Sequence, residues 1–226
     1  MSHASWIAGF VGAGLLVPGL LAAQGGVTVE LFARAGLAAP DEHFYEVFAN
    51  FSGDGPVEWT NGSLGRSFVA GLGLEVRLPS DRLRLRAEIL RTFDTWLLAT
   101  HSIVRPRVLF EPPEVKSTFL DVPSSLTLTS LQLVLPTRLE VWRFTPYALG
   151  GVGGKRYGFG ESTRPNEVEA VLPSAGFTWA WDLGGGLTVD LLGLGADVQV
   201  RDVISRYWGK TNHDLLVTGG IAWRPW

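Results

Sequence analysis

Residues 66–94 read RSFVAGLGLEVRLPSDRLRLRAEILRTFD, and apolar side chains occupy every second position of this stretch. The apolar parity holds Phe68, Ala70, Leu72, Leu74, Val76 and Leu78, and after Pro79-Ser80-Asp81 it holds Leu83, Leu85, Ala87 and Ile89. The opposite parity of the second arm holds Arg84, Arg86 and Glu88. Successive side chains of a strand point to opposite faces, so the stretch predicts a hairpin with one apolar and one polar face. Each arm exceeds the roughly 5–6 residues of a typical globular strand and suits the about 9–11 residues of a membrane-crossing strand.

The same alternation recurs along the rest of the chain. It predicts further strands at 27–36, 125–135, 144–157, 174–183, 187–201 and 214–226, which makes eight with the two arms of the hairpin. Polar stretches rich in Gly, Pro and Asn predict long loops at 38–65, 99–124, 158–173 and 202–213. Short turns are predicted at 79–81, 136–143 and 184–186. Long connections that alternate with short ones are typical of outer-membrane barrels. The fold class predicted is therefore all-β, an eight-stranded antiparallel up-and-down transmembrane β-barrel.

Three positions interrupt the alternation within the predicted strands. Beyond Ser130 the apolar parity switches, and a β-bulge there would restore it. Gly193 and Gly195 stand at a similar switch, which predicts bulges at those glycines as well.

The amino-terminal segment has a different pattern. Residues 6–23 are apolar and end on the small residue Ala23, as the core of a secretory signal peptide does. This predicts a signal peptide at 1–23 and a barrel domain at 24–226. The alternative, an uncleaved anchor helix, is disfavoured by Pro18-Gly19 and three further glycines in a stretch that barely reaches the length of a span.

Composition narrows the class of protein. Hydrophobic residues make up 46% of the 226-residue chain, and charged residues make up 18%, below the roughly 25% of soluble domains. The formal net charge of −3 gives no basis for binding nucleic acid. The absence of cysteine fits an envelope protein that forms no disulfides.

Alternation alone does not say which face of the barrel is apolar, because a secreted lipocalin-like barrel has its apolar face inside. Six acids and five arginines occupy the polar parity, and such a balanced set predicts a closed interior in which charges pair. These residues are Glu30, Arg34, Glu75, Arg77, Arg84, Arg86, Glu88, Asp182, Asp190, Asp197 and Arg201. Aromatic residues near the strand ends predict two interfacial girdles. The girdles consist of Phe68, Trp96, Tyr157 and Phe177 at the loop end and Trp142, Phe144, Trp181 and Trp223 at the turn end. Both features favour an apolar face in contact with lipid.

The strand rhythm, the amino-terminal segment and the terminal aromatic Trp226 resemble the small outer-membrane barrels of the OmpA, OmpX and OmpW type, over the whole chain after residue 23. The resemblance implies a monomer in the outer membrane of a Gram-negative-type bacterium, surrounded by outer-membrane lipid. It also implies that Trp226 is the signal recognised by the outer-membrane assembly machinery.

Barrels of this type include lipid A deacylases and acyltransferases, which need a nucleophile beside a base. Three histidines follow residue 23 (His43, His101 and His213), and His101 and Ser102 would point to opposite faces of a strand. The glycine-rich stretch at 150–156 lacks the spacing of a phosphate-binding loop. We therefore predict no enzymatic activity, no cofactor and no metal.

The function expected is a structural or interaction role, with an interior plugged by paired charges, since an eight-stranded barrel has room inside only for its own side chains. Two alternatives remain open. One is a narrow passage or binding site for small apolar molecules, as in the OmpW type, and the other is an enzyme that modifies lipids of the outer leaflet.

Overall fold

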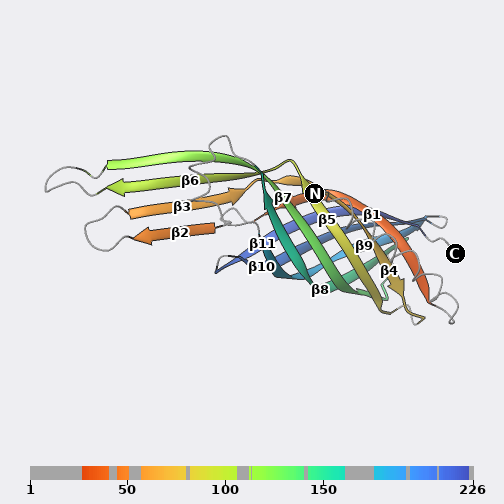
Figure 1. The fold of residues 1–226 in the computed structure, drawn as a ribbon. Helices are drawn as coiled ribbons and strands as arrows, with labels where there is room; N and C mark the ends of the chain where they lie inside the picture. Colours follow the sequence, from red (N-terminus) through yellow and green to blue (C-terminus); the bar gives the residue numbers. More distant parts are fainter. Residues whose placement is uncertain are drawn as a thin grey trace, which may run out of the picture.

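The computed structural model describes residues 27–40, 45–50, 57–79, 82–105, 112, 114–139, 142–160, 176–191, 194–207 and 209–223. They form eleven antiparallel strands (Figure 1): β1 (Thr28–Ala39), β2 (Tyr45–Asn50), β3 (Val57–Leu64), β4 (Ser67–Arg77), β5 (Arg84–Phe93), β6 (Thr95–Arg105), β7 (Glu114–Pro136), β8 (Phe144–Phe159), β9 (Phe177–Leu191), β10 (Leu194–Tyr207) and β11 (Lys210–Trp223). Within these ranges no helix has the length and apolar character needed to cross a membrane. The predicted signal peptide, the assembly signal Trp226, His43 and most of the loop at 158–173 lie outside the described residues.

Eight of the strands close into a barrel. The strands β1, β4, β5, β7, β8, β9, β10 and β11 each pair with the next in this order, and β11 pairs with β1 to complete the ring. Chain neighbours are therefore spatial neighbours throughout the ring, which confirms the predicted eight-stranded antiparallel up-and-down barrel. In β4 and β5 the apolar parity predicted from residues 66–94 points outward, and Glu75, Arg84, Arg86 and Glu88 are buried inside.

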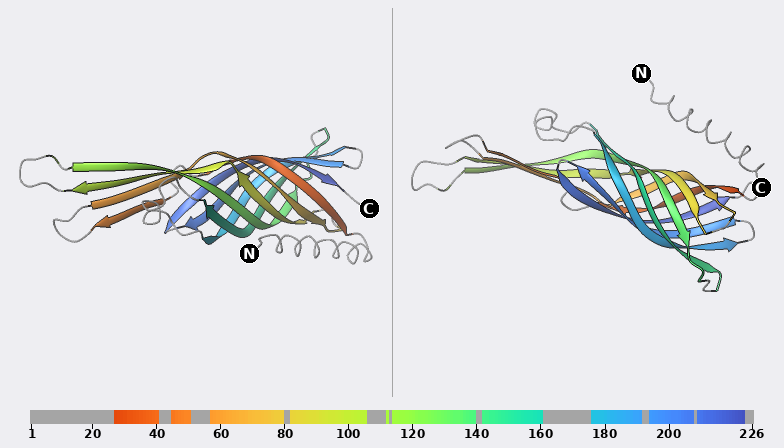
Figure 2. Two further views of the ribbon diagram at one scale, coloured as in Figure 1. Left: turned by 45° about the horizontal axis from the view of Figure 1, so that its top comes forward. Right: turned by 90° about the horizontal axis from the view of Figure 1, so that it is seen from below.

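The other strands form a sheet that projects from one end of the barrel (Figures 1 and 2). Its order is β2-β3-β6-β7, and it uses the first part of β7, residues 114–124, which pairs with β6. We call this sheet the extension, and the barrel end that carries it the extension end. The opposite end, with the connections at 78–83, 137–143 and 192–193, is the turn end.

The extension corrects the prediction of long loops at 38–65 and 99–124. These segments hold β2, β3, β6 and the first part of β7. Most of residues 114–119 are exposed, on both parities of the strand. A strand that buries neither face needs no apolar alternation, which is why the periodicity of the sequence missed it. The passage from barrel to extension occurs at Asp94, whose φ of 55° interrupts β5 and β6.

The boundaries of the last three barrel strands also differ from the prediction. β9 runs through residues 184–186, which were expected to form a turn, and it connects to β10 at 192–193. β10 and β11 form a hairpin over the predicted loop at 202–213, with Gly209 at a φ of 78°. Gly186 faces the lumen opposite Tyr147, whose hydroxyl lies 2.5 Å from the place of a Cβ. That glycine makes room for a ring and forms no turn.

The predicted bulge at Ser130 is wrong. β7 pairs residue for residue with β8 from Ser124 to Pro136 and with β5 across Ser130. Leu126 and Leu128 point inward with Ser130, whereas Leu131 points outward. The same parity points inward along the whole strand. The apparent switch in the sequence arises because the inward residues change from apolar to polar along the lumen. Gly195 likewise pairs in register without a bulge, and Gly193 lies outside the described residues.

A second lumen-facing glycine gives a test of the packing. Gly73 lies opposite Phe32, and a Cβ there would be 2.3 Å from the ring and 2.5 Å from the carbonyl oxygen of Ala87. We expect Gly73→Val to lower the free energy of unfolding by about 1–3 kcal/mol through overpacking. The measurement is urea unfolding of the protein folded into lipid vesicles. The matched control is Gly219→Val, because Gly219 faces outward and its Cβ would meet nothing nearer than 3.7 Å.

Candidate functional site: the barrel lumen

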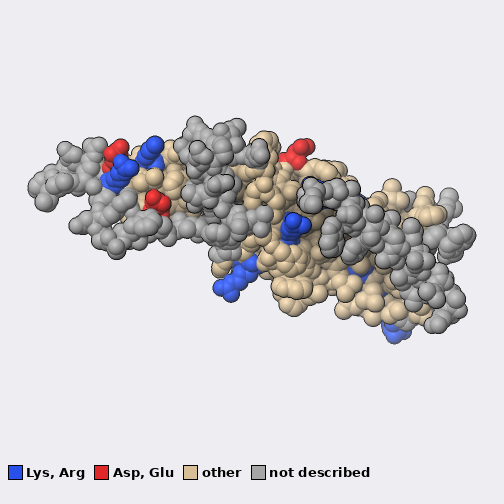
Figure 3. All heavy atoms as spheres, viewed as in Figure 1, with Lys and Arg blue, Asp and Glu red and all other residues tan. Residues whose placement is uncertain are grey.

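The barrel wall exposes apolar side chains and buries charged ones. Leu72, Leu183 and Ile221 are 62%, 58% and 62% exposed, whereas Arg201 is 1% exposed. Figure 3 shows few charged side chains over the barrel surface on the face in view. A soluble protein buries its large apolar side chains and keeps its charges in water, so this barrel has the reverse arrangement.

The central layer of the lumen is organised by Arg34 of β1 and Arg201 of β10. Arg34 donates to Glu88 at 3.3 Å, and it also pairs with Asp197 at 2.5 Å. Arg201 pairs with Glu88 from the other side and with Asp182 at 3.3 Å. Glu88 therefore lies between two arginines, and all four strands that supply these groups are tied together across the lumen.

Towards the turn end, Glu75 of β4 is the common partner of three arginines. Arg86 lies 2.6 Å from its carboxylate, Arg84 3.3 Å and Arg77 3.5 Å. Arg77 also pairs with Glu30 at 2.8 Å. Each of these three guanidinium groups thus binds a buried carboxylate, and the fork geometry of Arg favours such pairs.

The two layers join through Arg86 and Asp197, which lie 3.7 Å apart. Ion pairs with alternating sign therefore connect ten of the eleven charged residues predicted for the interior: Glu30, Arg34, Glu75, Arg77, Arg84, Arg86, Glu88, Asp182, Asp197 and Arg201. Neutral groups complete the layer, since the Tyr147 hydroxyl donates to Asp197 at 2.9 Å and Gln132 donates to Asp182 at 2.9 Å. Asp190, the eleventh, is exposed at the turn end and lines the cavity described below.

The half of the lumen nearer the extension end is apolar, which the sequence reasoning missed. Its buried residues form two clusters: Ala38, Val69, Leu90, Leu128, Ala180, Val203 and Leu216, and beyond them Leu64, Leu97, Ala99, Leu120, Val122, Leu126, Tyr157 and Tyr207. Val69 and Leu90 lie on the parity that carries charges further along the same strands, and Leu128 lies on the parity that carries Ser130 and Gln132. An apolar residue on the polar parity was the signal in the sequence that could have revealed this layer.

One ion pair is enclosed within the apolar layer. Lys155 of β8 is 1% exposed, pairs with Asp214 of β11 and donates to the Ser205 hydroxyl at 3.0 Å. Neither Lys155 nor Asp214 belonged to the predicted interior set.

Most predicted girdle residues lie on the outer surface near the strand ends. Phe68 and Phe93 are neighbours at the extension end, with ring centroids 6.3 Å apart, and Trp142 and Phe144 are neighbours at the turn end, 6.0 Å apart. Phe177 and Trp96 are exposed at the extension end, and Trp223 is exposed at the turn end of β11.

Two predicted girdle positions are corrected. Tyr157 is 1% exposed and lies inside the barrel, with its ring 4.4 Å from that of Tyr207, because its parity on β8 is inward. Trp181 faces outward but lies nearer the extension end of β9 than the turn end, because β9 continues ten residues beyond it to Leu191.

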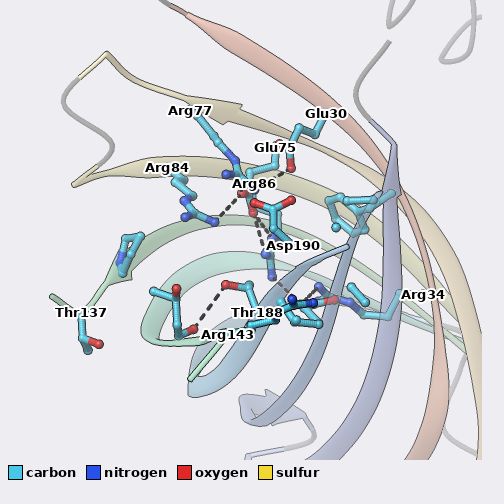
Figure 4. Close-up of a pocket in the computed structure, with 18 of the residues that line it drawn as sticks. Glu30, Arg34, Glu75, Arg77, Arg84, Arg86, Thr137, Arg143, Thr188 and Asp190 are labelled. Atoms are coloured by element: carbon cyan, nitrogen blue, oxygen red, sulfur yellow. Dashed lines mark hydrogen bonds and ion pairs between the residues drawn. The ribbon is translucent and has the colours of Figure 1, made fainter. Parts of the chain in front are cut away.

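A cavity of about 500 Å³ opens the lumen at the turn end (Figure 4). Charged side chains dominate its lining, among them Glu30, Arg77, Arg84, Arg143 and Asp190. A second cavity, within the apolar layer, has a volume of only about 10 Å³, which holds about one water molecule. The wide part of the lumen therefore lies at the turn end.

Two histidines, His101 and His213, lie within the described ranges. His101 shares a hydrogen bond of 2.8 Å with the Thr60 hydroxyl in the extension, and His213 pairs with Asp202 at 2.8 Å on the outer surface. Over the described ranges, no group of three or more His, Cys, Asp or Glu side chains is placed to hold a metal ion.

No protein-family model matches the sequence, and no curated protein matches it. Two solved structures match the chain at low identity. The crystal structure of Neisserial surface protein A (NspA) shares 12% sequence identity over 88% of this chain and 99% of that chain, with a TM-score of 0.46. The CymD monoaromatic hydrocarbon channel shares 9% identity over 89% of each chain, with a TM-score of 0.21. Similarities this distant assign no function, and the architecture described above rests on the strand pairing.

Proposed function

We propose that this protein is an outer-membrane barrel that does not conduct ions and that has a structural or interaction role, with the extension as its contact surface. The observation that carries the proposal is the filling of the lumen by a connected set of ion pairs backed by an apolar layer. An eight-stranded barrel encloses only enough space for its own side chains, and here those side chains bind one another.

The outer surface supports the proposed membrane placement. Exposed apolar side chains surround the barrel, and aromatic side chains gather near both ends, which is the pattern of a lipid-facing wall with interfacial girdles. In such barrels the short turns face the periplasm and the longer connections face outward. The extension therefore lies outside the cell, where exposed side chains such as Phe119 and Val115, 75% and 59% exposed, can contact a partner.

Cysteine labelling tests this orientation, because the chain has no cysteine of its own. With a reagent that does not cross membranes, we expect Phe119→Cys to react on intact cells. We expect Arg138→Cys, at the exposed connection between β7 and β8, to react only after the outer membrane is opened. Labelling of Arg138→Cys but not Phe119→Cys on intact cells would reverse the orientation.

Planar bilayer recording tests the closed lumen. We expect the wild-type protein to show no steady conductance, because the ion-paired layer and the apolar layer block the path from the turn-end cavity. The control is the triple variant Arg201→Ala, Tyr157→Ala and Tyr207→Ala, which removes large side chains from both layers. We expect this variant to show brief conducting events. Reproducible channels in the wild type, changed in size by substitution of Arg84 or Asp190, would support a passage for small molecules and refute the closed barrel.

A further inference from the structure

The outer face of β5, β7 and β8 carries an unusual pair of charges. Arg91 of β5 pairs in register with Thr127 of β7, which pairs in register with Arg156 of β8. The three side chains share the outward parity, and both arginines are exposed. Neighbouring strands lie about 4.8 Å apart, so the two arginines flank Thr127 at about 10 Å from each other. We call these three residues the arginine row.

Among the described residues, the arginine row has no acidic partner. Arg91 and Arg156 form no ion pair with any described residue, although every arginine of the central lumen layer does. Asp94, the next acid along the strand, also forms none. Two positive charges therefore lie on either side of Thr127 on the outer face of these three strands.

The depth of the row follows from the strand geometry. Leu135, exposed near the turn end of β7, and Thr127 are eight residues apart, which is about 27 Å along a strand. With the roughly 40° tilt of barrel strands this corresponds to about 20 Å along the membrane normal, most of the about 25 Å apolar band of such barrels. Exposed Phe93 and Phe177 lie beside the row, as expected for the membrane–water interface at the extension end.

An unpaired arginine is costly in hydrocarbon, and the cost falls close to zero at the interface. Lipid phosphate groups lie at that depth, and guanidinium groups bind phosphate through paired, charge-assisted hydrogen bonds. We propose that Arg91 and Arg156, with the Thr127 hydroxyl between them, bind the phosphate of a lipid headgroup in the leaflet at the extension end. This inference rests on the proposed membrane placement.

The test measures lipid binding to the full chain folded in a neutral maltoside detergent, by native mass spectrometry. The probes are lipid A, which carries phosphates on its sugar headgroup, and the same lipid A after its phosphates are removed. We expect Arg91→Gln with Arg156→Gln to weaken binding of phosphorylated lipid A at least about tenfold. Arg91→Lys with Arg156→Lys should bind with intermediate affinity, because lysine keeps the charge and loses the fork.

The matched control is Arg206→Gln. Arg206 is an exposed arginine at the extension end of β10 that pairs in register with Thr211, with no second arginine beside it. We expect this variant to bind phosphorylated lipid A as the wild type does, within about twofold.

Two results would overturn the inference while the barrel still inserts into vesicles. One is an equal loss in Arg206→Gln and in the paired variant, which would mean general attraction by positive charge. The other is equal wild-type binding of the dephosphorylated lipid, which would mean recognition of acyl chains alone. A wild-type protein that fails to insert into vesicles would instead refute the membrane placement itself. Each variant's folding is checked by its heat-dependent migration on a gel, and the Lys pair provides a second reading if the Gln pair does not fold.

Discussion

Arg201→Ala is expected to lower the free energy of unfolding by about 3–5 kcal/mol, as the removal of one partner from a buried ion pair does. Arg201 is 1% exposed, and among the described residues it is the ion-pair partner of Asp182. Its loss leaves the Asp182 carboxylate buried with the Gln132 amide as its hydrogen-bond donor among the described residues, and it leaves Glu88 with Arg34 as its remaining ion-pair partner in the central layer. Urea unfolding from lipid vesicles measures the effect.

The control removes one positive and one negative charge of the same ion pair together. Arg201→Leu with Asp182→Leu should recover a substantial part of the stability lost in Arg201→Ala, because Glu88 keeps its ion pair with Arg34 and no buried charge remains without a partner. Replacing a buried pair by apolar groups of similar volume is often close to neutral. If the double variant is less stable than the single one, the layer is not held by charge compensation and the central part of our description is wrong.

Leu131→Arg is expected to destabilise the barrel by about 2–4 kcal/mol, the cost of an arginine on the lipid face near the bilayer midplane. Leu131 is 55% exposed on β7, halfway between Leu135 and Thr127. The same unfolding experiment in vesicles gives the value.

Leu139→Arg is the matched control, since Leu139 is 69% exposed in the connection beyond β7, at the turn end. We expect a change of less than about 1 kcal/mol, as for arginine near the interface. Equal effects of the two substitutions, or a wild-type protein recovered in the soluble fraction without detergent, would contradict a lipid-facing wall.

The alternation of residues 66–94 was sufficient to predict the hairpin, its two faces and the class of fold, because in a barrel wall every second residue meets lipid and the others meet the lumen. It was not sufficient to find strand ends. The glycines at 184–186 have the composition of a turn, yet Gly186 is required by the ring of Tyr147 from a neighbouring strand. The prolines of residues 99–124 indicated a loop, yet residues 114–124 form an edge of the extension.

The sequence by itself determined the number of barrel strands and the division of each strand into an apolar and a polar parity, because both depend on the side-chain period of a single strand. Tertiary structure alone decided which charges meet, since Arg201 contacts Glu88 across strands more than one hundred residues apart in the chain. It also decided that Leu126 and Leu128 belong inside. The physical reason is that the alternation of one strand records only that two environments differ. Whether the inner environment is ionic or apolar at a given height depends on what the other seven strands place there.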